Sequence, residues 1–599
     1  MLQVVVIILN LLFRKNHILK NKVSLISLVF VCIVLLAYRV NYSDLKGGPP
    51  LKITFWDANG YYLYLPSIIH YHDYKQLKWL DTIDARYHVT GGNGFQAQKV
   101  ENGNYVFKYL GGVALMELPF YYAGEFAANL LHYPVDGFSP PYQYSLGFGI
   151  LFYNFIALWL LRRILLLFFS DINVAITLIL TTLATNYIQY VSIDNGQSHA
   201  YLFLVYTLVL YLTIIWHQKP KTLISVLLGY FMGLAMICRP TEAVIILIPI
   251  LWNTQNKENA GKKWGLVGKN RIQVLIMAAS GFLGVLPQLI YWKMATGSLV
   301  YDVGSKWEFL SPHFQVLIGW EKGWFIYTPA TILFIAGFLF SKRFDFFKSA
   351  AWFCFLNIYI IIAWHDWRYG GSYSTRALVQ SYPVLALPLA ALVDEAIKRR
   401  FWVGVLCFAG LYLTAVNCFQ ITQYCNSIIL FDGMNRLYYG RIYLNPHPSE
   451  KDMAFLDNDE VVDDESRYSA TKIYHSDSGR ALHFGAGEKY CLAEADISSG
   501  DSKKDTYYKF ECTLRSDCCL WPSFLGADFV ADTVVKSGKD RLYSPISVSG
   551  AYNYYVFYLK KPENLERGKV RLYVTSSNTF DGQVSSFAVT KLVNKEGLK

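Results

Sequence analysis

The stretch RKNHILKNKVSLISLVFVCIVLLAYR, residues 14–39, places a basic cluster directly before a long apolar run. Residues 23–39 are long enough to cross a bilayer as an α-helix, which takes about 17 to 25 apolar residues. Basic residues flank membrane helices on the cytoplasmic side. We therefore expect this helix to run from inside to outside, and Asp57, which follows it, to lie on the outer face.

Composition indicates a membrane protein with many spans. The 599-residue chain is 53% hydrophobic and 17% charged, and apolar runs recur over its first 420 positions. Its 45 Tyr and 39 Phe residues suit a protein whose aromatic rings line the membrane interface. The net charge of +11 comes mainly from short Lys and Arg clusters between apolar runs, so it indicates topology and not nucleic-acid binding.

Residues 109–131 decide how the later segments are counted. They contain Glu117, Glu125, Pro119 and a Gly pair, so we expect an amphipathic element on the outer surface and not a span. The basic clusters that follow then all fall inside, and the C-terminus falls outside. The eleven expected spans are 23–39, 143–166, 172–191, 199–216, 222–238, 240–252, 273–292, 324–340, 349–364, 376–394 and 402–420.

Beyond residue 440 the pattern changes from helices to strands. Short apolar runs alternate with polar residues, as in YYKFECTLRS (507–516), NYYVFYLKK (553–561) and KVRLYVTSS (569–577). Such alternation between turn residues is typical of an antiparallel β-sandwich. We expect a jelly-roll-like, extracytoplasmic domain here, and two roles stay open for it, sugar binding or packing alone.

The expected class is therefore a polytopic α-helical membrane protein with a C-terminal β-sandwich. Its parts are an N-terminal cytoplasmic or interfacial segment (1–22), a transmembrane module (23–424) with a long first outer loop (40–142), a connector (425–444) and the sandwich (445–599). We expect residues 445–466, which are acidic, to form a surface linker or extended arm. Four cysteines of the sandwich could pair in an oxidising compartment: Cys491, Cys512, Cys518 and Cys519.

The first outer loop opens with WDANGYYLYLPS, residues 56–67, in which one carboxylate, Asp57, stands among aromatic residues. At a membrane surface a carboxylate can take the proton of a reacting hydroxyl. Asp81 and Asp84, in WLDTIDARYH, are the rival acids of this loop. The alternative is that Asp57 caps a helix beginning near Asn59, since Asp is a favoured N-cap residue.

Cations suited to a phosphate stand where apolar helices end. Arg239, in MICRPTEA, follows one helix directly, and the turn WHDWRYGGSYSTR (364–376) carries Arg368 and Arg376 around a Gly pair. Guanidiniums and exposed backbone N–H groups bind phosphate well. Lys306 adds a cation in the preceding outer loop. The other interpretation of Arg239 is a side chain that snorkels to lipid headgroups.

Four motifs, in this order, resemble the GT-C superfamily of polyprenyl-phosphate-sugar glycosyltransferases: WDANGYYLYLPS, KYLGGVALMELPFYYAG, GWEKGWFIYTPATILFIAGF and WHDWRYGGSYSTRALVQSYPVLALPLAAL. The chain is most similar to bacterial members related to the protein O-mannosyltransferases and the lipid A aminoarabinose transferases. The likeness covers about residues 20–420. Its most specific pieces are the Gly-Gly-x-x-x-x-Arg turn and the Gly-x-x-x-Tyr-x-Pro helix entry. The sandwich resembles the carbohydrate-binding-like domains that follow such modules.

The resemblance implies an inverting transfer of a sugar from a polyprenyl-phosphate donor to an acceptor hydroxyl, with Asp57 as general base. The expected donor-phosphate ligands are Arg239, Lys306, Arg368 and Arg376, and the expected acceptor or sugar ligands are Tyr61, Asp81, Asp84, His365 and Asp366. The acceptor would be a glycan, a lipid or a protein. The expected location is the bacterial inner membrane.

One departure from the family concerns a metal ion. Many relatives carry two adjacent acids in the first loop, whereas here Ala58 and Asn59 follow Asp57. The sequence therefore assigns no metal ligand and leaves a divalent-metal requirement open.

Two other classes of protein compete with an enzyme. A transporter or flippase for lipid-linked glycans needs a polar path through its helices, yet acids within the expected spans are almost absent, Glu242 near Arg239 being the exception. A glycan-binding adhesin or sensor needs only one membrane helix. Convergence of Asp57, Arg239 and the 364–376 turn on one site would favour the enzyme.

Overall fold

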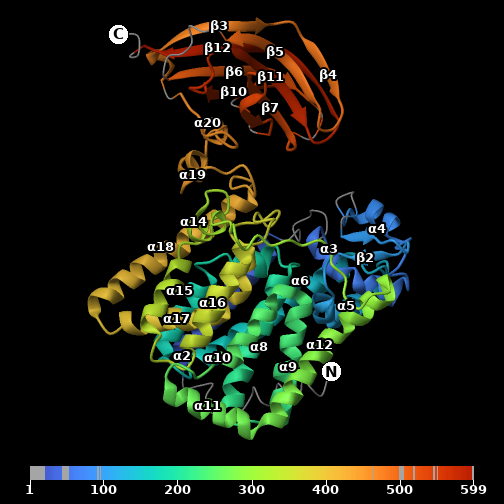
Figure 1. Cartoon of the computed structure of the whole chain (residues 1–599), viewed down its shortest axis with the longest axis vertical. Helices are drawn as coiled ribbons and strands as arrows, with labels where there is room; N and C mark the ends of the chain where they lie inside the picture. The colour runs from blue at the N-terminus through green and yellow to red at the C-terminus, as the bar shows by residue number, and fades with distance from the viewer. Residues whose placement is uncertain are drawn as a thin grey trace. The chain divides into compact units, whose positions relative to one another are not determined.

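A computed structural model of the chain describes residues 21–42, 53–90, 94, 96–462, 464–497, 505–516, 518, 520–543, 545, 547–549 and 551–595. The chain forms two compact units, Met1–Ile421 and Thr422–Lys599, which we describe separately (Figure 1). The expected N-terminal segment lies almost wholly outside the described residues.

The first unit is helical. Its α-helices are α2 (Lys22–Asn41), α3 (Asp57–Tyr62), α4 (Leu80–Tyr87), α5 (Gly112–Leu130), α6 (Pro140–Leu165), α7 (Asp171–Thr182), α8 (Ser198–Gln218), α9 (Thr222–Cys238), α10 (Leu247–Leu251), α11 (Lys257–Lys269), α12 (Arg271–Thr296), α13 (Gln315–Ile318), α14 (Trp324–Tyr327), α15 (Thr331–Gly337), α16 (Phe347–Ile362), α17 (Tyr382–Ala396) and α18 (Arg400–Cys425), which ends beyond the boundary. Short 3₁₀ or π turns are η2 (Pro66–His70), η3 (Gln189–Ile193), η4 (Pro240–Ile246), η5 (Phe338–Phe340) and η6 (Arg376–Ser381). Strands β1 (Ala97–Lys99) and β2 (Tyr105–Phe107) pair antiparallel.

Six helices of the described chain are long and apolar enough to cross a membrane: Lys22–Asn41, Pro140–Leu165, Ser198–Gln218, Arg271–Thr296, Arg376–Ala396 and Arg400–Cys425. The other five expected spans fall on shorter apolar helices, Asp171–Thr182, Thr222–Cys238, Pro240–Leu251, Thr331–Phe340 and Phe347–Ile362. The expected span 324–340 is interrupted between α14 and α15, where Thr328 leaves the helical conformation (φ −133°, ψ 63°) directly before Pro329. A total of eleven spans remains a prediction.

Helix α5, expected to lie on the outer surface, is a continuous helix with Pro119 inside it. One face packs against α6: Gly124 lies so close to this helix that a Cβ on it would stand 2.7 Å from Tyr142 Cα. The opposite side exposes Tyr122 and Phe126 at 51% and 72%. An apolar face of this kind suits contact with lipid.

Two glycines fix the end of α9 that carries Arg239. Gly229 and Gly233, one turn apart, face α12, and a Cβ on Gly233 would lie 2.1 Å from the Gly281 carbonyl oxygen. Small residues of this kind let membrane helices approach closely. The close packing of α9 on α12 therefore positions the residue that follows α9.

Figure 1 shows α11 at one end of the first unit and α3, α4 and β2 at the opposite end. Helix α11 contains much of the basic cluster 256–271, which the sequence places inside. Asp57 begins α3. The charge pattern and the arrangement of the helices thus put Asp57 and this basic cluster at opposite ends of the bundle.

The second unit contains the β-sandwich. Its elements are α19 (Arg436–Ile442), α20 (Glu450–Met453), η7 (Glu465–Arg467), β3 (Tyr468–Ser476), β4 (Arg480–Phe484), β5 (Lys489–Ile497), β6 (Thr506–Arg515), β7 (Ser523–Val530), β8 (Val534–Arg541), β9 (Ser547–Ser549), β10 (Tyr552–Lys560), β11 (Gly568–Ser576) and β12 (Phe580–Asn594). One sheet has the order β3-β12-β6-β10-β9, with β4 also paired to β12, and the other has the order β5-β11-β7-β8. All the pairings are antiparallel.

The alternating pattern read from the sequence accounts for the core between these sheets. Alternate residues of β6 turn inward, and Phe510 and Leu514 are fully buried there with Phe557 of β10 and Leu572 of β11. The expected antiparallel sheets and their three quoted strands are confirmed.

The acidic stretch 445–466, expected to be a surface linker or extended arm, is attached to the sandwich by an ion pair. The side chain of its Asp457 is 6% exposed and lies 2.9 Å from Arg541 of β8, which also pairs with Asp432 at 3.2 Å. A buried carboxylate needs such a partner, and the acidic pattern alone does not reveal it. The expected connector 425–444 includes α19 and belongs to the second unit.

Whether the four cysteines of the sandwich pair in an oxidising compartment stays open. Cys491, Cys512 and Cys518 are free thiols, and Cys519 lies outside the described residues.

Topology can be tested by labelling single cysteines in intact cells. Lys75→Cys and Ala470→Cys place exposed thiols in the first outer loop and in β3, and we expect a membrane-impermeant maleimide to modify both. Lys269→Cys, at the end of α11, is the matched control and should react only after the membrane is permeabilised. Protection of position 75 or 470, measured against the parent protein, would contradict the proposed topology.

Candidate functional site

The centre of the candidate site is an ion pair between two residues 319 positions apart in the chain. Arg376 Nη2 donates a hydrogen bond of 2.6 Å to Asp57 Oδ2, and the two side chains are 9% and 23% exposed. Asp57 comes from the first outer loop and Arg376 from the first residue of η6. The structure therefore joins two residues that the sequence proposed separately.

Tyr109 holds the other oxygen of the carboxylate. Its hydroxyl donates a hydrogen bond of 2.6 Å to Asp57 Oδ1. The ring of Tyr61 lies 4.6 Å from the ring of Tyr109, and the Tyr61 hydroxyl donates to Ser198 Oγ at 3.2 Å. Asp57 is thus held from both sides, by a cation and by a neutral phenol.

Asp57 does not act as a helix cap. Helix α3 begins at Asp57 itself, its N-cap position is Trp56, and no side chain caps it. Trp56 has a φ of 51°, in the left-handed region, where a bulky side chain is strained. Its backbone is held there by a hydrogen bond of 3.1 Å to the Val89 carbonyl. The capping alternative is therefore wrong for this helix.

Electrostatics keep Asp57 ionised. Burial alone would raise the pKa of its carboxyl, but the Arg376 guanidinium and the Tyr109 hydrogen bond outweigh burial, so the pKa lies below its usual value. Burial, and next the negative charge of Asp57, raise the pKa of Tyr109. The phenol therefore remains a donor and the carboxylate an acceptor.

Arg239 lies in the same region. Its Nη1 lies 3.4 Å from His199 Nδ1. The same Nδ1 of His199 lies 2.9 Å from Gln380 Oε1. Gln380 follows Arg376 by one helical turn in η6. Gln380 Nε2 in turn donates to Glu242 at 3.2 Å. His199 connects Arg239 to η6.

Both guanidiniums act electrostatically on the same two phenols. Burial raises the pKa of Tyr61, whereas Arg239 and Arg376 both lower it. The same two cations lower the pKa of Tyr369, against a larger effect of burial.

The 364–376 turn is fixed by a lysine, not by its own cations. Lys322, which is buried, donates to the carbonyl oxygens of Arg368 (2.7 Å) and Gly370. Arg368 points elsewhere: its Nε donates to Glu321 at 2.8 Å, and its side chain is 55% exposed. Of the two arginines of the turn, Arg376 pairs with Asp57 and Arg368 with Glu321.

Five other proposed ligands make no hydrogen bond or ion pair with Asp57 or Arg376 within the described chain. Asp84 accepts from the Thr90 backbone N–H and hydroxyl at 2.7 and 2.6 Å, and so closes the turn after α4. His365 lies 2.6 Å from Glu308. Lys306, Asp81 and Asp366 are exposed.

Sequence reasoning missed Tyr109 and Asp194. Tyr109 was part of the quoted motif KYLGG, and its position directly before the Gly pair was the available signal. Asp194 lies in the turn before α8. Burial raises its pKa to about 6, with Arg376 opposing this shift and Asp57 adding to it.

A metal ion does not fit the groups observed. Within the described residues no cluster of three or more His, Cys, Asp or Glu side chains could hold a metal ion. Both Asp57 oxygens already accept hydrogen bonds. We therefore derive no reaction step through a metal.

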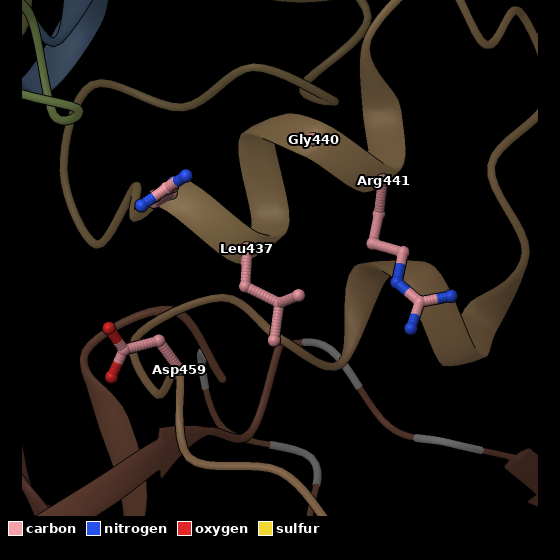
Figure 2. Close-up of a pocket in the computed structure, with 5 residues that line it drawn as sticks. Leu437, Gly440, Arg441 and Asp459 are labelled. Carbon is pink, nitrogen blue, oxygen red and sulfur yellow. The ribbon is translucent and has the colours of Figure 1, made fainter. Parts of the chain in front are cut away.

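A separate hollow of about 480 Å³ lies in the second unit and is lined by Arg436, Leu437, Gly440, Arg441 and Asp459. Figure 2 shows the Leu437 side chain pointing into it from α19, with Asp459 and Arg441 to either side. The Arg441 guanidinium lies 5.4 Å from the centre of the Phe455 ring. This hollow shares no residue with the Asp57 site.

Comparison with known proteins gives no family assignment, since no protein-family model and no curated protein matches the chain. Among solved structures, the chain is similar to the oligosaccharyltransferase AglB from Archaeoglobus fulgidus in complex with an inhibitory peptide and a dolichol-phosphate, with 12% identity and a TM-score of 0.41 over 70% of this chain and 57% of that chain. The apo form of the oligosaccharyltransferase of this organism gives 12% identity and a TM-score of 0.40 over 74% and 60%.

The chain thus spans less than two thirds of either solved structure. A similarity at this level assigns no activity to this chain, so the function is argued from the site.

Asp194 makes stability depend on pH. Because its pKa of about 6 in the folded protein lies above the ordinary value of 3.8, the folded state binds the proton more tightly, and that stability is lost as the pH rises through 6. Between pH 5 and 7 the unfolding midpoint of the parent protein should fall by about 2 to 4 °C more than that of Asp194→Asn.

Thermal unfolding in detergent measures this difference. Asp302→Asn, which changes an exposed loop acid, is the control and should follow the parent protein. Equal pH dependence in the parent and in Asp194→Asn would show that Asp194 does not carry the shifted proton.

Proposed function

We propose that the protein is a multi-pass membrane glycosyltransferase of the GT-C kind, which transfers a sugar from a polyprenyl-phosphate donor to an acceptor hydroxyl on the extracytoplasmic face. The observation that carries this proposal is the pairing of Asp57 with Arg376, with Arg239 nearby, at the ends of apolar helices. A carboxylate paired with Arg376, in a cluster that reaches Arg239 through His199 and Gln380, supplies a base and a phosphate site together.

The donor explains why the cations stand at helix ends. A polyprenyl tail stays among the lipids, so its phosphate reaches the protein near the membrane surface. Arg376 and Arg239 can meet it there, because a guanidinium binds phosphate through two parallel hydrogen bonds. We assign the phosphate to these two residues, since Arg368 is engaged with Glu321 and Lys306 is exposed.

The reaction follows from this arrangement. The acceptor oxygen attacks the anomeric carbon from the side opposite the phosphate, and its proton passes to Asp57. The new carbon–oxygen bond forms as the carbon–phosphate-oxygen bond breaks, and the electron pair of the broken bond goes to the phosphate. The products are an inverted glycoside and polyprenyl phosphate, whose added negative charge the guanidiniums stabilise.

The acceptor side is formed by Tyr61 and the first outer loop. Tyr61 borders Tyr109 and is buried. Four other expected ligands make no hydrogen bond or ion pair with Asp57 or Arg376 within the described chain: Asp81, Asp84, His365 and Asp366. Their role would be limited to binding parts of the acceptor that lie away from the reacting hydroxyl. A bacterial inner membrane and a glycan, lipid or protein acceptor remain part of the proposal.

The Asp57→Asn variant tests the role of Asp57 as base without removing the donor-phosphate site. The variant keeps the size of the side chain but cannot take the acceptor proton, so turnover should fall by roughly 100-fold or more while donor binding survives. Asp81→Asn and Asp84→Asn should have milder effects. Turnover is measured with radiolabelled polyprenyl-phosphate sugars and a membrane extract as the source of acceptor.

Each variant must first show the parent elution profile in size-exclusion chromatography. A folded Asp57→Asn protein that transfers sugar at the parental rate would remove Asp57 from the chemistry. Movement of the donor across the membrane without transfer, in the parent protein, would instead favour a flippase.

The two site arginines are tested by Lys substitution. Lysine preserves the charge but cannot donate the two parallel hydrogen bonds that a guanidinium gives to a phosphate. Arg239→Lys and Arg376→Lys should each weaken donor binding by about tenfold. Arg368→Lys is the matched control, since Arg368 pairs with Glu321, and it should bind donor as the parent does. Parental affinity in both site variants would reduce Arg239 and Arg376 to structural contacts.

A further inference from the structure

The site as observed has both oxygens of the base occupied. Tyr109 donates to Oδ1 and Arg376 to Oδ2, each at 2.6 Å. Each oxygen keeps a second lone pair, but the Arg376 cation paired with Oδ2 lowers the affinity of the carboxylate for a proton. The carboxylate becomes a stronger base when this cation leaves.

We infer that the donor phosphate itself opens the Asp57–Arg376 pair, by drawing the guanidinium away, and that this frees Asp57 Oδ2 to act as the base. The inference rests on the proposed function. It makes Arg376 the link between donor binding and the acceptor reaction, and it makes Tyr109 the positioning residue that keeps the carboxylate in place.

Arg376 is suited to leave. Its guanidinium makes a single hydrogen bond to Asp57 and no other hydrogen bond within the described chain. A guanidinium carries five N–H donors, so most of them remain for a phosphate. Beside it stands Gly370, with a φ of 57°, where an added Cβ would be in van der Waals contact with Arg376 Nη2 at 3.7 Å. The guanidinium therefore has further donors for a phosphate.

Tyr109 is suited to stay. A Cβ on Gly60 would lie 2.1 Å from Tyr109 Cδ2, so the ring is pressed against the α3 backbone, and the Tyr61 ring covers it at 4.6 Å. A neutral phenol also gains less than a cation from moving to a phosphate. Asp57 would therefore keep its Oδ1 contact, and its orientation, after Oδ2 is released.

Charge explains why opening activates the base. In the pair, burial raises the pKa of Asp57, but the guanidinium and the Tyr109 hydrogen bond together outweigh burial and keep the pKa low, so the carboxylate is a weak base. When Arg376 turns to the phosphate, the half-buried carboxylate keeps only a neutral partner, and its affinity for a proton rises. Deprotonation of the acceptor then waits until the donor is bound, which protects the empty site from unproductive chemistry.

The inference predicts a gain of affinity on removal of the base. Polyprenyl phosphate must compete with Asp57 for Arg376, so Asp57→Asn should bind polyprenyl phosphate, without any sugar, about tenfold more tightly than the parent protein. Tyr109→Phe should bind it within about twofold of the parent, because the phenol does not compete for the guanidinium.

Glu321→Gln is the matched control, because it removes the carboxylate that pairs with the exposed Arg368, and its affinity should equal that of the parent. Microscale thermophoresis in detergent measures all four proteins. Equal or weaker binding by folded Asp57→Asn would overturn the inference and leave the proposed function standing. No binding of polyprenyl phosphate by any of the four proteins would overturn the proposed function itself.

A second measurement uses the parent protein alone and does not depend on a variant folding. Modification of Asp57 by a water-soluble carbodiimide, followed by mass spectrometry, should become at least about twofold faster with saturating polyprenyl phosphate, because a released carboxyl protonates more readily. An unchanged or slower rate would show that the pair stays closed.

Discussion

The ion pair between Asp57 and Arg376 is the interaction on which the site depends. It joins the first outer loop to the start of the helix that follows the 364–376 turn, and it buries a charge that needs its partner. An uncompensated buried charge is costly, so each residue specifies the position of the other. The strained backbone of Trp56, immediately before Asp57, is held by its hydrogen bond to the Val89 carbonyl.

The rest of the helical unit serves to present this pair and Arg239 together. Gly229 and Gly233 bring α9 against α12 and fix the end from which Arg239 projects. Lys322 binds the carbonyl groups of the Gly-Gly turn and fixes the approach to Arg376. Close packing and one buried lysine thus fix the two segments of chain from which Arg239 and Arg376 project.

The sequence could predict elements and individual candidates, but not their partners. Apolar runs predicted helices, and the alternation in β6 predicted a sandwich core, because both patterns are local. Arg368 and Arg376 look equivalent in sequence, yet one pairs with Glu321 and the other with Asp57. The sequence also did not reveal the partners of two other acids. Asp84 accepts from Thr90 in a local turn, and Asp457 pairs with Arg541, far along the chain.

The central claim is an inverting sugar transfer from a lipid-linked phosphate at this site. The most direct test is the anomeric configuration of the product, determined by proton NMR after the purified protein, reconstituted in liposomes, reacts with a polyprenyl-phosphate sugar of known configuration. The account predicts a glycoside whose anomeric configuration is opposite to that of the donor. A product with retained configuration, or no transfer from any polyprenyl-phosphate sugar when acceptor extract is present, would contradict it.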